Sequence, residues 1–272
     1  MSDRVILVLG STGTTGRRVV RQLRGAGVTV RAAARRGEVQ FDWSNPTTWD
    51  GALTGVTGMY LIAPHDMPIE PAFISRAVEL GVCRVVLLSS RAIEVMGDER
   101  LMAAERAVRE SGIDWTVLRP DWFNQNFDEG FFRPAVLAGH VALPVGETRQ
   151  VFVDADDIAA VAAVVLTGDG YAGRSYEVTG PDPLSFADAV DIISEVSGRH
   201  VRFTGDPDAY LAQQVAEGAS VPDTRNAIAA FDALRNLGDQ KPTDAVLRVT
   251  GRSPRDFRTY AAQAAASGRW DG

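Results

Sequence analysis

The fold is decided by a stretch near the start of the chain, Val5-Ile6-Leu7-Val8-Leu9-Gly10-Ser11-Thr12-Gly13-Thr14-Thr15-Gly16. Its first five residues form a continuous apolar run, typical of a strand buried on both faces of a parallel sheet. A G-x-x-G-x-x-G loop follows, and apolar residues at helical spacing begin at its last glycine. Such a loop turns tightly and presents free helix N–H groups to a pyrophosphate. We therefore expect all seven residues from Gly10 to Gly16 to bind a dinucleotide; a tight turn without a ligand is the alternative.

Outward from this stretch, short apolar runs alternate with amphipathic segments. We predict strands at 5–9, 28–34, 58–63, 84–88 and 114–118, and helices at 16–24, 71–80 and 101–111. This order implies right-handed crossovers and a doubly wound, mostly parallel α/β sheet of the Rossmann type. Further along we predict a helix at 156–166, a strand at 175–178 and helices at 185–197, 210–217, 224–237 and 254–266.

Length and composition fit one core with an appendage. The chain has 272 residues, of which 45% are hydrophobic and 23% charged, so intrinsic disorder is excluded. We expect an NADP-binding Rossmann core at 1–120, to which 151–178 returns. A smaller C-terminal substrate-binding part is expected from 121–150 and 179–272.

Several classes of protein are disfavoured. The net charge of −7 argues against nucleic-acid partners, and the longest apolar run, 158–166, is too short to span a membrane. No secretory leader is visible, so we expect a cytoplasmic protein, either a monomer or a homodimer. The single cysteine, Cys83, is expected to be a buried small hydrophobe and cannot form an internal disulfide. No metal is expected; we interpret Asp157 as opening the helix at 156–166.

The second predicted strand indicates which nucleotide is bound. An NAD site usually has a carboxylate at the end of this strand, where this chain has Arg35 and Arg36. Arginine suits a 2′-phosphate because it donates paired, charge-assisted hydrogen bonds. NADP(H) is therefore favoured, unless both arginines merely solvate the strand end.

Ketone-reducing short-chain enzymes use a Tyr-x-x-x-Lys pair, in which tyrosine donates a proton. Four residues beyond the five tyrosines stand Pro64, Ser175, Gly180, Gln214 and Ala264, and the only lysine is Lys241. The standard acid is therefore absent. Hydride transfer to a substrate that already carries positive charge, such as an iminium, needs only hydride and positioning.

The sequence resembles the NmrA-like atypical short-chain dehydrogenase/reductases. The resemblance rests on the glycine loop, 30–35, 87–90, 111–120 and 153–159. Within that family, 41–49, 60–64 and 122–127 are most similar to the festuclavine/agroclavine dehydrogenase branch, which reduces an iminium with NADPH and also lacks the Tyr/Lys pair. The wider family includes quinone reductases and catalytically silent redox sensors.

The resemblance also implies roles by position. Asp42 and Trp43 would flank the adenine, Ile62, Ala63 and Pro64 would line the cofactor, and Ser89 and Ser90 would lie near the nicotinamide ribose. Each has a structural alternative: Asp42 could cap a turn, and the serines could simply end a strand. Catalytic residues are unknown, with His65, Asp66, Ser90 and Asp121 as weak candidates.

The densest aromatic cluster follows the 114–118 strand. We expect Trp122, Phe123, Asn126 and Phe127 to contact the substrate, with core packing as the alternative for some of them. The sequence thus predicts an NADPH-dependent reductase that transfers hydride to a small organic acceptor, imine/iminium or quinone-like. The alternatives are a non-catalytic NADP(H)-binding regulator and, less strongly indicated, a cofactor-dependent isomerase.

Overall fold

The structure, a computed structural model, describes residues 4–271. Its centre is a seven-stranded sheet in which every adjacent pair of strands is parallel, in the order β3-β2-β1-β4-β5-β6-β8. The strands are β1 (Val5–Leu9), β2 (Thr29–Ala34), β3 (Val39–Gln40), β4 (Gly58–Ile62), β5 (Arg84–Leu88), β6 (Asp114–Pro120) and β8 (Arg174–Val178). The order reverses between β1 and β4, and ligands of such sheets bind at the carboxyl edge of this switch point.

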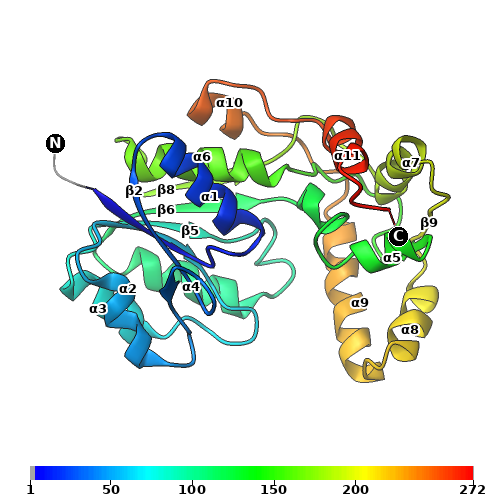
Figure 1. Ribbon diagram of the computed structural model, residues 1–272. Helices are drawn as coiled ribbons and strands as arrows, with labels where there is room; N and C mark the ends of the chain where they lie inside the picture. The colour runs from blue at the N-terminus through cyan, green and yellow to red at the C-terminus, as the bar shows by residue number, and fades with distance from the viewer. Residues whose placement is uncertain (1–3, 272) are drawn as a thin grey trace.

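Helices cover both faces of the sheet (Figure 1). One face packs against α1 (Thr14–Gly25), α6 (Ala155–Thr167) and α10 (Ala245–Thr250). The other packs against α2 (Trp49–Leu53), α3 (Pro71–Glu79) and α4 (Glu99–Arg109). Strand residues alternate between these two cores, with Leu7 in one and Val8 in the other, which explains why the strands read as continuous apolar runs.

A third apolar core lies beside the sheet, on the right in Figure 1. It is formed around α5 (Arg133–Leu137), α7 (Phe186–Ser197), α11 (Phe257–Ala266) and a parallel pair of short strands, β7 (His140–Ala142) and β9 (Arg202–Thr204). The helices α8 (Pro207–Ala216) and α9 (Val221–Asn236) pack on each other next to it. Two 3-10 turns, η1 (Pro46–Thr48) and η2 (Asn124–Asn126), complete the described elements.

The Rossmann-type fold is confirmed, and every strand and helix predicted from the sequence is present, with boundaries that differ by up to three residues. Six short helices and strands of the described chain were not predicted, namely α2, α5, α10, β3, β7 and β9, and neither were the two 3-10 turns. Within 179–272, α10 packs against α6 and β8 and not in the third core. Among residues 4–271, no helix combines the length and the apolar character needed to cross a bilayer.

Two local expectations were wrong. Cys83 is exposed, because it lies in the turn before β5 and its thiol reaches only the carbonyl oxygen of Thr57, at 3.2 Å. Asp157 does not open α6; Asp154 is the N-cap, and its carboxylate accepts a 2.8 Å hydrogen bond from the N–H of Asp156. The negative charge of Asp156 and Asp157 still lies in the first turn, where the helix dipole favours it.

Candidate functional site

The glycine loop turns sharply between β1 and α1. Gly10 has a φ of +62°, and the N–H of Gly13 donates to its carbonyl oxygen at 2.8 Å. The N–H of Ser11 donates to Ala33 of the neighbouring β2 at 3.1 Å, which fixes the loop to the sheet. Thr12 and Gly13 are exposed at its tip, Thr14 is half-buried, and Ser11, Thr15 and Gly16 are buried.

The amino end of α1 fits an anion. Gly13 is its N-cap and supplies no side-chain acceptor, and the first turn contains no acidic residue. Side chains cap other long helices of the chain, namely Asp154 on α6, Ser185 on α7, Ser220 on α9 and Asp256 on α11. The uncapped N–H groups of α1 therefore remain available, and backbone N–H groups at a helix start are a standard phosphate site.

Arg35 and Arg36 lie directly after β2 and beside this loop. Both are exposed, and neither makes an ion pair or side-chain hydrogen bond with another residue in the described part of the chain. In the same turn, a Cβ added to Gly37 would lie 3.2 Å from the Ser11 hydroxyl, so the turn abuts the glycine loop. Two guanidinium groups that make no ion pair or side-chain hydrogen bond in the described chain thus lie beside the glycine loop.

Asp42 and Trp43 follow β3. The hydroxyl and N–H of Ser44 donate to Asp42 at 2.8 and 3.0 Å, and these hydrogen bonds lower the pKa of the Asp42 carboxyl. Trp43 is half-buried and packs edge-to-face on Phe41 and Phe73. Asp42 therefore stabilises its own turn, while part of Trp43 stays accessible at the carboxyl edge of the sheet.

The next two strands bring further expected residues to that edge. Ile62, Ala63 and Pro64 end β4 and continue beyond it. After β5, the Ser89 hydroxyl donates at 2.7 Å to Glu105 of α4. Arg119 donates to the same carboxylate at 2.8 and 2.7 Å, so Ser89 belongs to a buried structural network. Ser90 is half-buried, and its hydroxyl donates to the carbonyl of Arg91 at 3.3 Å.

The remaining acid candidates differ sharply in environment. His65 and Asp66 are exposed in the loop after β4. Asp121 is buried, accepts from the N–H of Trp122 at 2.7 Å and forms a 2.9 Å ion pair with Arg91. Burial raises the pKa of Asp121, with the Trp122 N–H and Arg91 opposing the rise. Its side chain is engaged on both sides, as expected of a residue that fixes the end of β6.

Aromatic side chains gather beyond β6. Trp122 and Phe123 are half-buried and Asn126 is partly exposed, whereas Phe127 has no exposed surface and packs in the third core. A further aromatic ring, which the sequence did not single out, comes from α9: Phe231 lies nearly parallel to Trp122, at 24° and 6.4 Å between centroids. Trp122, Phe131 and Phe231 form what we call the aromatic wall.

The aspartates at the start of α6 are balanced by arginines. Arg255 contacts Asp154 at 3.1 Å, and its N–H donates to Asp157 at 2.7 Å, while Arg252 pairs with Asp157 at 2.8 Å. Asp156 pairs with Arg21. No group of metal-ligating side chains occurs among residues 4–271, and these carboxylates act in helix capping and ion pairing.

Residues 10–169 match the NAD(P)H-binding family. Over 94% of the chain, the sequence is 32% identical to Prestalk A differentiation protein A of Dictyostelium discoideum, covering 91% of that protein. It is 30% identical to Festuclavine synthase I of Penicillium roqueforti, again over 94% of the chain and 96% of the relative. Among solved structures, triphenylmethane reductase of Citrobacter sp., crystallised with NADP(H), has a TM-score of 0.73 at 21% identity, covering 96% and 99% of the two chains.

The chain therefore belongs to the NAD(P)H-binding family of NmrA-like, atypical short-chain dehydrogenase/reductases. The resemblance to this family, including its festuclavine branch, is confirmed. The likeness to triphenylmethane reductase supports the Rossmann-type fold.

Proposed function

We propose that this protein is an NADPH-dependent reductase that transfers hydride to an electron-poor organic acceptor, imine/iminium or quinone-like, without a Tyr–Lys pair. One observation carries the proposal. The uncapped start of α1 and the unpartnered Arg35 and Arg36 lie at the same carboxyl edge of the sheet from which the segment bearing Trp122 departs.

Different residues of the chain would bind different parts of the cofactor. The loop from Gly10 to Gly16 would hold the pyrophosphate, and Arg35 with Arg36 would hold the 2′-phosphate, which favours NADPH over NADH. Ile62, Ala63 and Pro64 would line the nucleotide, and Ser90 would face its ribose. The cofactor supplies a hydride when bound; the chain supplies binding, orientation and exclusion of water.

The tyrosines support hydride transfer without a protein acid of the Tyr–Lys kind. Tyr60 and Tyr176 are buried in the sheet core, and burial raises the pKa of Tyr60. The hydroxyl of Tyr260 donates to Asp128 at 2.8 Å. Burial, together with the neighbouring Asp128 carboxylate, raises the pKa of Tyr260 well above its ordinary value. The only lysine, Lys241, is exposed. An acceptor that is already cationic, or whose product takes its proton from water, matches such a site.

The aromatic wall defines the acceptor class further. Trp122 is half-buried and Phe131 is 63% exposed, so apolar ring surface remains accessible. Flat aromatic molecules stack on such rings, and a cation over a ring face gains about 0.5–2 kcal/mol. We therefore place planar, aromatic acceptors, cationic or quinonoid, ahead of small aliphatic ketones.

The test uses NADPH deuterated at the transferred position and three acceptors. We expect deuterium on the reduced carbon of N-methyl-3,4-dihydroisoquinolinium, oxidation of NADPH by 1,4-naphthoquinone, and no reaction with cyclohexanone. Calorimetry measures NADPH binding separately. Tight NADPH binding with no oxidation by any acceptor would contradict a reductase and favour the NADP(H)-binding regulator.

A further inference from the structure

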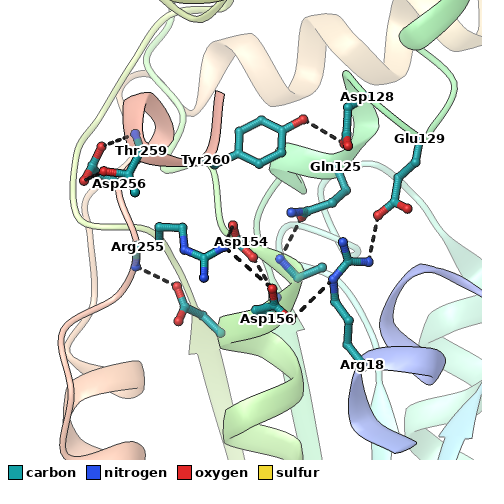
Figure 2. A network of polar contacts seen from close by, with 12 residues as sticks. Arg18, Gln125, Asp128, Glu129, Asp154, Asp156, Arg255, Asp256, Thr259 and Tyr260 are labelled. Carbon is teal, nitrogen blue, oxygen red and sulfur yellow. Dashed lines mark hydrogen bonds and ion pairs between the residues drawn. The ribbon is translucent and has the colours of Figure 1, made fainter. Parts of the chain in front are cut away.

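The guanidinium group of Arg18 contacts three segments of the chain where the helices on one face of the sheet meet the third core. Arg18, in the second turn of α1, donates to the carbonyl oxygen of Thr14 at 2.8 Å and to Glu129 at 2.7 Å. Its Nε lies 3.5 Å from Asp156 at the start of α6. Arg17 pairs with the second oxygen of Glu129, so both carboxylate oxygens are occupied by α1. Figure 2 shows Arg18 between Glu129 and Asp156.

Glu129 belongs to the wall segment, defined as residues 121–132 between β6 and α5. Other contacts hold this segment to α6 and to the third core: Gln125 accepts from the N–H of Ala155, the first residue of α6, at 2.7 Å, and Trp270 of the third core donates to the carbonyl of Phe127 at 2.8 Å. Among the hydrogen bonds and ion pairs of residues 4–271, Glu129 alone ties the wall segment to the cofactor helix α1.

The contact between Arg18 and Glu129 is sheltered. Each side chain is only 12% exposed, so solvent and salt screen this pair much less than a surface pair. Removing one partner of a sheltered pair leaves the other charge poorly solvated, which is costly. The pair therefore strongly favours the arrangement in which the wall segment rests on α1.

We propose that Glu129 is a positioning residue that couples occupation of the dinucleotide site to the placement of the aromatic wall. The proposal rests on the proposed NADPH binding. A pyrophosphate at the start of α1 would order Thr14, whose carbonyl is bound by Arg18, and Arg18 passes this constraint to Glu129 and the wall segment. The acceptor then meets a more firmly held wall on the cofactor-loaded protein, and by linkage the wall segment stabilises bound NADPH in return.

Hydrogen–deuterium exchange tests this coupling without requiring turnover, because exchange rates report local opening. NADPH should slow amide exchange across 121–132 at least about fivefold in the parent protein and less than about twofold in Glu129→Gln. Exchange at 10–16 should slow equally in both proteins. Glu195→Gln is the matched control: it removes an exposed interhelical pair with Arg258, 2.9 Å long, and should behave as the parent.

Steady-state kinetics with 1,4-naphthoquinone gives the second measurement. Glu129→Gln should raise KM for the quinone about tenfold and, by the same linkage, raise the Kd of NADPH by up to about threefold. Glu129→Asp, which keeps the charge, should recover most of both losses. Equal slowing of 121–132 by NADPH in Glu129→Gln and the parent would overturn the proposal. If NADPH binds but no acceptor is reduced, the proposed function fails while the exchange result still decides the coupling. If Glu129→Gln unfolds, Arg18→Gln, which removes the other charge of the pair, decides the coupling by the same exchange measurement.

Discussion

Gly16 lies so close to Gly10 that a Cβ added to Gly16 would stand 2.1 Å from the Gly10 carbonyl oxygen. The contact closes the glycine loop, because the first turn of α1 packs directly on the end of β1. A Cβ on Gly13 would meet the same oxygen at a more tolerable 3.2 Å, while Gly25, at the other end of the helix, has nothing within 4 Å. The third glycine of the motif is thus required by the protein itself, whatever ligand binds.

Gly16→Ala should therefore open the loop and weaken NADPH binding at least about a hundredfold, or about 2.7 kcal/mol. Gly25→Ala, in the same helix, should leave binding unchanged and stabilise the fold by about 0.4–1 kcal/mol, because it only reduces the freedom of the unfolded chain. Calorimetry with NADPH and urea unfolding measure the two effects. Unchanged NADPH affinity in a folded Gly16→Ala protein would show that the loop does not hold the nucleotide.

Arg35→Glu should weaken NADPH binding at least about tenfold more than NADH binding, because it sets a carboxylate against the 2′-phosphate. Arg174→Glu is the control, since Arg174 is also exposed but lies at the amino end of β8. Both nucleotides are titrated by calorimetry against each protein. Equal losses for NADPH and NADH would remove Arg35 from the 2′-phosphate site.

Changing each tyrosine to phenylalanine should leave the hydride step within about tenfold, or about 1.4 kcal/mol. The physical reason is that no tyrosine is followed four positions later by the lysine that would make it an effective acid. Single-turnover kinetics with deuterated NADPH isolates the step, and Tyr260→Phe additionally reports the cost of the lost Asp128 hydrogen bond in urea unfolding. A thousandfold slower hydride step in any one variant would reveal a hidden acid.

The unfolding free energy of Asp121→Asn should increase relative to that of the parent as the pH rises through the interval above 3.8, the ordinary pKa of an aspartate, up to the raised pKa of Asp121. In this interval the folded parent keeps a proton that the unfolded chain has released, so its unfolding free energy falls with increasing pH. The variant lacks this titration but keeps an oxygen for the Trp122 N–H. Urea unfolding of both proteins at several pH values measures the difference; a difference that falls with pH would contradict the raised pKa.

Phe231→Ala should raise KM for 1,4-naphthoquinone several-fold, because aromatic pairs contribute about 0.5–1.5 kcal/mol. The Kd of NADPH should not change, since Phe231 lies on α9 and contacts Trp122, away from the glycine loop. Val215→Ala, an exposed change on the neighbouring α8, is the control. Steady-state kinetics measures KM for the quinone in both variants. A KM raised in Phe231→Ala but not in Val215→Ala supports a wall residue, and equal KM values in the two variants would mean that Phe231 only supports the packing of the helices.

The Rossmann half was predictable because its signals are local. Val5 to Leu9 is apolar without interruption, the glycines follow at fixed spacing, and Gly25 to Gly27 end the helix. Each of these patterns is set by neighbours in sequence. The same locality placed the start of the predicted 185–197 helix at Ser185. In the structure the side chains of Ser185 and Asp188 each accept a hydrogen bond from the other's backbone N–H, which forms a capping box.

The rest depends on contacts that no local pattern contains. Phe231 is one aromatic residue on an otherwise ordinary helix, and only the tertiary fold brings it to Trp122. Phe127 was grouped with Trp122 by sequence proximity, yet its ring lies wholly inside the third core. The ion pair of Glu129 with Arg18 spans 111 residues of sequence. Strands as short as β7 and β9, three residues each, carry too little periodicity to be read.

The position of α10 has a consequence for how the protein is made. This helix buries Ala245, Val246 and Val249 against the sheet face that α1 and α6 also cover, and just beyond it Arg252 and Arg255 neutralise Asp157 and Asp154. These stretches follow α6 in the chain, after the segments that form most of the third core. During synthesis the face of the sheet under α1 and α6 therefore keeps an apolar gap, and Asp154 and Asp157 lack these arginines, until α10 and the residues just beyond it have been made. During that time the nascent chain is open to chaperones and proteases.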